Sequence, residues 1–120
     1  MAVRGIRGAI TVEENTSQAI VEAAQELLKE IVDRNKINTE DICSVFLTLT
    51  DDLNAEFPAL AARKKMGWEH VPLLCAKELS VPHGLAKCIR VMMHVNTGLT
   101  QKEIKHVYLR KATALRPDLS

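Results

Sequence analysis

Apolar and polar positions alternate at the start of the chain. Residues 3–12 read VRGIRGAITV, and β-branched side chains recur through this segment. The main apolar row consists of Ile6, Gly8, Ile10 and Val12. Arg7 falls on the other side, among small residues. A period of two is typical of a strand with one buried face, so we predict a β-strand that projects Arg7 away from the main apolar row.

A helical period follows between residues 17 and 35. Apolar side chains recur there at three- and four-residue spacing, and charged residues occupy most of the opposite side. This pattern predicts one amphipathic helix about 30 Å long. Asn15, Thr16 and Ser17 all suit the N-cap, and Gln18 stands three residues after Asn15, as in a capping box. The apolar stripe is Ile20, Ala24, Leu27, Leu28 and Ile31.

Further segments have strand-like patterns, at residues 42–50, 71–75, 88–95 and 106–110. In the first of these, one face would carry Cys43, Val45, Leu47 and Leu49. Pro72 has no N–H, which favours an edge or irregular strand for its segment. In the segment CIRVMMHV, Arg90 falls on the face opposite the apolar row Ile89, Val91, Met93 and Val95.

Short helical turns complete the predicted elements. Pro58 suits the first turn of a short helix through Met66, which Gly67 would end. Thr100 and Glu103 have the spacing of a capping box. Together the elements predict the α/β class, in an α+β-like arrangement: a mixed five-stranded sheet with helices on one face, in a single domain over residues 1–120. Apolar and small residues on both strand faces favour an oligomer that covers the second face.

Composition narrows the classes of function. The chain has 120 residues, 16 of them basic and 15 acidic, and aromatic residues make up 3%. This balance disfavours a nucleic-acid partner. No apolar run approaches the roughly 20 residues of a membrane span. The first ten residues have no long apolar core, which disfavours a secretory signal. We therefore expect a cytoplasmic protein with neither a nucleic-acid nor a membrane partner.

Cysteine and histidine spacing disfavours a metal centre. No two of the three cysteines form a CxxC pair, and the four histidines are scattered. We therefore predict reduced thiols and no bound metal. GxSxG, P-loop and GxGxxG motifs are absent from the sequence, and Cys75 has no neighbouring base. Acyl transfer, nucleotide hydrolysis, dinucleotide-dependent redox chemistry and a nucleophilic thiol therefore have no support.

Arg90 is the most informative single position because a cation inside an apolar strand needs a partner. It fits an arginine at a subunit interface paired with a carboxylate, or an anion-binding arginine in a dry pocket. Arg7 strengthens the second interpretation. Glu78 and Tyr108 could join such a pocket, although a surface glutamate and a core tyrosine are the default interpretations. The residues alone indicate an anion-binding pocket on a small oligomeric α/β protein and leave the reaction open.

Six ordered blocks resemble one family, the trimeric, monofunctional chorismate mutases of the bacterial AroH class. They are VRGIRGAITVE (3–13), TDDLNAEFPA (50–59), GWEHVPLLCAKEL (67–79), KCIRVMMHVNT (87–97), HVYLRKA (106–112) and LRPDL (115–119). The resemblance implies conversion of chorismate to prephenate, in tyrosine and phenylalanine biosynthesis. It also implies a homotrimer that forms a pseudo-α/β barrel, with active sites in clefts between subunits and no cofactor.

The resemblance further implies roles for individual residues. Arg90 would face the ether oxygen and one carboxylate of the substrate, and Arg7 and Tyr108 would bind a carboxylate. Glu78 would accept a hydrogen bond from the ring hydroxyl, with Cys75 close by. Residues expected to form walls, neighbouring-subunit contacts or a cover are Leu73, Leu74, Ala76, Lys77, Phe57, Ala59, Arg63, Leu115 and Arg116.

Two other functions are also considered. One is an imine or enamine hydrolase of the Rid type, another trimeric enzyme that uses an arginine for a carboxylate. The other is a non-catalytic trimer that holds a dicarboxylate between subunits. Turnover of a small imine, or ligand binding without conversion, would distinguish them. The joint presence of Arg7, Glu78, Arg90 and Tyr108 in their matching blocks favours the mutase.

Overall fold

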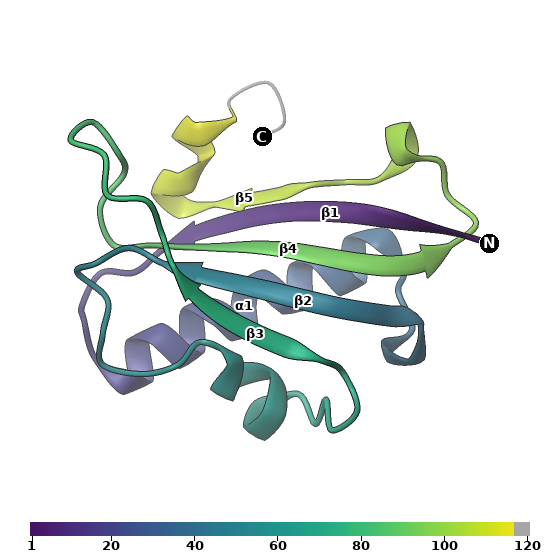
Figure 1. Ribbon diagram of the computed structural model, residues 1–120, viewed down its shortest axis with the longest axis horizontal. Coiled ribbons are helices and arrows are strands. Elements are labelled where there is room, and N and C mark those ends of the chain that lie inside the picture. Colours follow the sequence, from purple (N-terminus) through teal and green to yellow (C-terminus); the bar gives the residue numbers. More distant parts are fainter. Residues whose placement is uncertain (117–120) are drawn as a thin grey trace.

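The computed structural model describes residues 1–116, and within them the chain forms a mixed five-stranded sheet packed against one long helix (Figure 1). The strands lie in the order β3-β2-β4-β1-β5. β4 is antiparallel to both β1 and β2, whereas β3 is parallel to β2 and β5 is parallel to β1. The bounds are β1 Ala2–Thr11, α1 Ser17–Asn35, β2 Ile42–Leu49, β3 Leu73–Lys77, β4 Cys88–Thr97 and β5 Val107–Leu109. The predicted fold class is confirmed.

α1 begins one residue later than the predicted capping box requires. Thr16 is the N-cap, and its hydroxyl accepts the N–H of Ala19. Gln18 bonds to Glu22 one turn further along, so the predicted Asn15–Gln18 box is wrong. The Asn15 side chain instead accepts backbone N–H groups of residues 54 and 55, because a side chain outside the helix can satisfy the adjacent loop.

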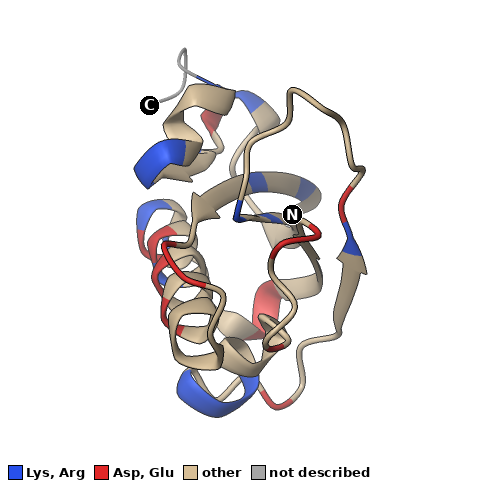
Figure 2. Ribbon diagram, turned by 90° about the vertical axis from the view of Figure 1, so that its left-hand side faces the viewer, with Lys and Arg blue, Asp and Glu red and all other residues tan. Residues whose placement is uncertain are grey.

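The main core lies between α1 and one face of the sheet. The apolar stripe of α1 packs against side chains of β1 and β4, and its largest members are fully buried, as are Ile6, Ile10, Ile89 and Met93. Gly8 allows the helix to approach closely, because a Cβ there would lie 2.9 Å from the carbonyl oxygen of Val107 and 3.0 Å from Cδ1 of Ile31. Figure 2 shows α1 on one side of the sheet, with acidic and basic residues along its outer surface.

β2 differs from the sequence prediction in which residues share one of its faces. Its register with β4 shifts between Ile42 and Ser44, where an irregularity interrupts the ladder. As a result Ile42 is buried while Cys43 is only half-buried, so the predicted grouping of Cys43 with Val45 on one face is wrong. An extra residue in one strand reverses the alternation beyond it, which a strict period of two does not anticipate.

Short elements surround the sheet: η1 (Thr39–Asp41), η2 (Ala61–Lys65), η3 (Gln101–Glu103) and η4 (Arg110–Leu115). The predicted short helix becomes the wider π-turn η2, in which the N–H of Met66 donates to the carbonyl of Ala61. Gly67 follows it at φ +68°, as expected for the residue that ends a helix. The predicted capping box at Thr100 and Glu103 is confirmed.

The second face of the sheet is largely open. Large apolar side chains are exposed on it, among them Val3, Phe46, Leu74 and Met92. At one end, η4 and the β3–β4 connection cover a small separate cluster that contains Ala9, Cys88, Ala112, Leu85 and Tyr108. No helix among residues 1–116 is long and apolar enough to cross a membrane.

Candidate active site

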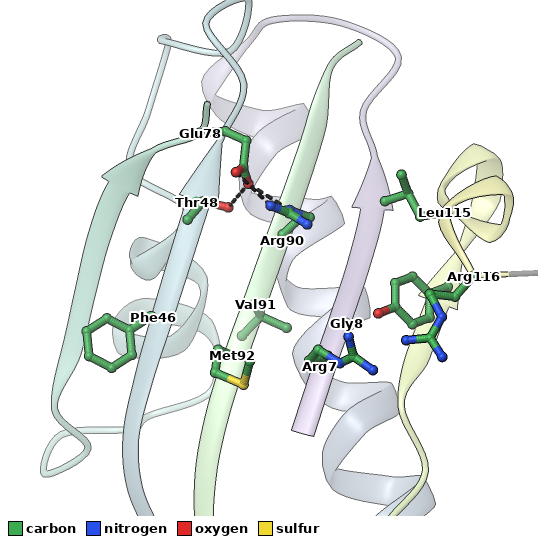
Figure 3. Close-up of a pocket in the computed structure, with 11 residues that line it drawn as sticks. Arg7, Gly8, Phe46, Thr48, Glu78, Arg90, Val91, Met92, Leu115 and Arg116 are labelled. Atoms are coloured by element: carbon green, nitrogen blue, oxygen red, sulfur yellow. Dashed lines mark hydrogen bonds and ion pairs between the residues drawn. The ribbon is translucent and has the colours of Figure 1, made fainter. Parts of the chain in front are cut away.

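A cleft of about 310 Å³ lies on the open face of the sheet, where β1, β4 and the end of β3 bring charged side chains together (Figure 3). Arg7 comes from β1, Arg90 from β4, and Glu78 directly follows β3. Thr48 of β2 stands opposite Arg90 in the sheet. Glu78 is held at this position because its N–H donates to the carbonyl of Leu49 at 2.8 Å, which continues the pairing of β3 with β2 by one residue.

Arg90 and Glu78 form a two-bond ion pair within this cleft. Nε of Arg90 lies 2.7 Å from Oε2 of Glu78, and Nη2 lies 2.6 Å from Oε1. The Thr48 hydroxyl donates to Oε2 at 2.7 Å. The guanidinium therefore faces Glu78 with its Nε and Nη2 atoms. Within residues 1–116, Nη1 has no hydrogen-bond partner.

The ion pair sets the charge state of both partners. The Arg90 hydrogen bonds, together with that from Thr48, lower the pKa of Glu78 to about 2, against the effect of burial. The same pair raises the pKa of Arg90. Glu78 is thus a carboxylate near neutral pH, so it can accept hydrogen bonds but cannot donate one.

Arg7 adds positive charge that no acidic side chain among residues 1–116 balances within ion-pair distance. Its backbone N–H donates to Nδ1 of His106 at 2.9 Å, immediately before β5 pairs with β1. Burial, with further contributions from Arg7 and Arg116, lowers the pKa of His106. The imidazole therefore stays neutral and keeps its acceptor nitrogen for Arg7 near neutral pH.

The remaining lining of the cleft comes from β5 and η4 on one side and apolar strand residues on the other. Tyr108 stands opposite Ala9 and close enough to Arg90 to interact electrostatically. Leu115 and Arg116 also line the cleft, and the Arg116 side chain lies near Arg7 (Figure 3). Phe46 and Met92 line the cleft as well. A second space of about 330 Å³ shares Glu78, Arg90 and Leu115 with the cleft and extends under the β3–β4 connection.

The other predicted site residues lie elsewhere in the single chain. Phe57, Cys75, Ala76 and Lys77 line a separate cavity of about 520 Å³ beside the β2–β3 edge. Cys75 of β3 faces the helix side of the sheet, because it pairs with buried Leu47 of β2. The remaining four are buried Ala59, exposed Arg63 on η2, half-buried Leu73 and exposed Leu74.

Thr48, Phe46 and Met92 line the cleft and were missed as site residues. The alternation of β2 and β4 already placed them on the outer face, together with Arg90, so the signal was present. What the sequence did not show is the alignment of β3 with β2, which brings Glu78 within reach of Thr48.

The arrangement is suited to binding an anion and lacks an obvious nucleophile. Guanidinium groups are good partners for carboxylates because their planar donors match the two oxygens. Cys88 lies next to Arg90 in the strand, but burial raises its pKa to about 11, so its thiol stays protonated near neutral pH. Among residues 1–116 no group of three or more His, Cys, Asp or Glu side chains could hold a metal ion.

Comparison with known proteins decides the family. The family model described as chorismate mutase type I matches residues 3–119. The chain belongs to the type I chorismate mutase family. It is 49% identical to chorismate mutase AroH of Bacillus subtilis (strain 168) over 120 residues, which cover all of this chain and 94% of the relative. It is 51% identical to chorismate mutase AroH of Thermus thermophilus over 118 residues, covering 98% and 96%.

A solved structure agrees with these sequence relatives. The chorismate mutase from Clostridium thermocellum matches with a TM-score of 0.90 and 53% identity, over 92% of this chain and 97% of that one. The family predicted from the six sequence blocks is therefore confirmed, and with it the predicted activity and enzyme class. Chorismate mutases are isomerases of aromatic amino acid biosynthesis, and chorismate is their substrate.

Proposed function

We propose that the protein rearranges chorismate to prephenate in the cleft in front of Arg90, with Arg90, Glu78, Arg7 and Tyr108 as the groups that contact the substrate. The observation that carries this proposal is the geometry of Arg90. Glu78 holds its guanidinium from the side through Nε and Nη2, which leaves Nη1 for a ligand. An oriented cation beside a carboxylate that stays ionised near neutral pH suits a reaction without proton transfer.

The reaction is a concerted electron shift within one molecule. The ether C–O bond of chorismate breaks while a new C–C bond forms, and no atom leaves or enters. Negative charge develops on the ether oxygen in the transition state, and donors fixed in advance stabilise it without having to reorganise. Arg90 would supply these donors, and the cleft would hold the flexible dianion in its compact, reactive conformer.

The other cleft residues would bind the ends of the substrate. Arg7 and Tyr108 would bind a carboxylate, and Leu115 of η4 and the adjoining Arg116 would cover the cleft. Glu78 would accept a hydrogen bond from the ring hydroxyl, since its low pKa keeps it ionised near neutral pH. No cofactor is needed for any of these tasks.

We further propose that the working unit is a homotrimer in which a neighbouring subunit completes each site. Phe46 is 42% exposed and Leu74 is 59% exposed on the open face, which is an unusual place for large apolar side chains in a monomer. Phe57, which the resemblance places across the subunit interface, lies outside the Arg90 cleft and lines a cavity at the β2–β3 edge of the sheet. Apposition of that edge to the neighbour's cleft would supply Phe57, together with Ala59 and Arg63.

The test is a chorismate-consumption assay with the product identified. Purified protein treated with EDTA should convert chorismate to prephenate with one product formed per substrate consumed. Folded protein that binds chorismate without converting it would refute the proposal and favour the dicarboxylate-binding trimer. Turnover of a small imine alone would favour the Rid-type hydrolase. The expected cytoplasmic location stays a prediction.

A further inference from the structure

Thr48 is hydrogen-bonded to the carboxylate of the Glu78–Arg90 ion pair. It lies on β2, directly opposite Arg90 on β4 and opposite Ala76 on β3. Its hydroxyl donates to Oε2 of Glu78 at 2.7 Å, the same oxygen that accepts from Nε of Arg90. Side chains of two neighbouring strands therefore meet at the carboxylate of Glu78, which directly follows β3 (Figure 3).

Thr48 has the fewest rotatable bonds of the three side chains. Glu78 and Arg90 are long side chains with several rotatable bonds, and the Arg90 side chain is 53% exposed. Threonine is branched at Cβ, which restricts χ1, and Thr48 lies within a central strand. Holding two long side chains in one geometry costs side-chain entropy, so an ion pair alone fixes its orientation less well than a pair that is also tied to the sheet. The hydrogen bond from Thr48 ties one carboxylate oxygen to the sheet.

We propose that Thr48 is a positioning residue of the active site, whose hydroxyl orients the Glu78 carboxylate and, through it, the guanidinium of Arg90. Oε2 is held by Thr48 and by Nε of Arg90, so Oε1 is the oxygen placed toward an incoming donor. Within residues 1–116, Oε1 accepts a bond from Nη2 and a long bond of 3.3 Å from the N–H of Leu79. The inference rests on the proposed function, because it assigns Thr48 a role through the groups that contact chorismate.

The experiment compares two substitutions that separate the hydroxyl from the shape of the side chain. Thr48→Val keeps the branched shape and the strand preference but removes the donor. Thr48→Ser keeps the donor and removes a methyl group. We expect Thr48→Val to lower kcat about tenfold, the loss that one hydrogen bond to a charged group typically causes. Thr48→Ser should retain kcat within about twofold, since the same bond can form.

A matched control lies on the same strand and face. The Ser44 hydroxyl also bonds a β4 side chain, His94 Nδ1 at 3.1 Å, and it lies outside the cleft lining. Ser44→Ala should leave kcat unchanged. Light scattering and thermal unfolding of all variants check that assembly and stability match the wild-type protein.

A second comparison tests whether Thr48 acts through Glu78. In a Glu78→Ala background the acceptor of the Thr48 hydroxyl is gone, so adding Thr48→Val should cause less than about a twofold further loss, a sign of coupled residues. A full additional tenfold loss would show that Thr48 acts by another route and would refute the proposal. So would a Thr48→Val enzyme as active as wild type, or a Thr48→Ser enzyme as impaired as Thr48→Val. Failure of the proposed function is seen separately, as a wild-type protein that does not convert chorismate.

Discussion

Replacement of Arg90 by lysine is the sharpest single test of how the cleft works. Arginine can donate to Glu78 with Nε and Nη2 and still offer Nη1 to the substrate. Lysine has one nitrogen at the end of a flexible chain, so its position is not set by a two-bond pair. The ammonium would remain with the Glu78 carboxylate or approach the substrate, but it could not reproduce both geometries.

The magnitude follows from the donor that is lost. A well-placed donor to a developing oxyanion is worth roughly 3–4 kcal/mol, which is on the order of 10²- to 10³-fold in kcat. We expect Arg90→Lys to lose on the order of 10²-fold in kcat, and Arg90→Ala to lose at least as much because the cation disappears too. The substrate would still meet Arg7, so binding should be weakened less than turnover.

The assay follows the loss of chorismate absorbance at saturating substrate, with the uncatalysed rearrangement subtracted. Arg34→Lys is a matched control, because Arg34 pairs with Glu30 at 2.8 Å on the surface of α1 and lies outside the cleft. That variant should keep wild-type kcat. An Arg90→Lys enzyme whose kcat is within about threefold of wild type would refute the argument. A single point charge would then serve as well as an oriented guanidinium with several donors.

Three further predictions concern packing and ionisation. Gly8→Ala should lower the free energy of unfolding by about 1–3 kcal/mol in urea titrations, because the new methyl group would lie 2.9 Å from the Val107 carbonyl oxygen; wild-type stability would contradict this contact. Glu78 has its pKa lowered from 4.5 to about 2, so its contribution to stability is complete above about pH 4.5 and declines as the pH falls toward 2. Urea unfolding at fixed protein concentration should therefore show a wild-type advantage over Glu78→Gln that is constant near neutral pH and shrinks in acid; an advantage independent of pH would count against the pair. His106 should titrate below 6.5 by NMR, and the wild-type protein should lose stability as the pH falls through 6.5, where the unfolded chain takes up the proton first. His106→Asn should remove that component, and a His106 that titrates above 6.5 would show that its nitrogen does not accept from Arg7.

Strong local periodicity explains which elements could be predicted. β1 and β4 alternate without interruption on the core side, and α1 has a continuous apolar stripe, so the type of each was set by its own residues. Pro72 correctly indicated an edge strand, although β3 begins just after it. The irregularity at Cys43 and the π-turn at η2 depend on pairing and packing with distant segments, and local patterns carry no signal for these.

Local sequence patterns likewise indicated some residues of the site and not others. Arg7 and Arg90 could be singled out because a cation on a strand needs a partner. The Glu78–Arg90 pair could not be derived from spacing, since it depends on the parallel alignment of β3 with β2 across a long connection. Thr48 became visible as a site residue only once that alignment was known.

The central claim is that each active site combines the Arg90 cleft of one subunit with Arg63 and its neighbours from another. A mixing experiment tests this claim most directly. Arg90→Ala and Arg63→Ala proteins, each expected to be nearly inactive, would be unfolded together in equal amounts and refolded. In a head-to-tail trimer about a quarter of the sites would then combine two unaltered halves. We predict recovery of about a quarter of wild-type activity in the mixed protein and none in either variant refolded alone. Mixed oligomers without any recovery would show that each site lies within one chain.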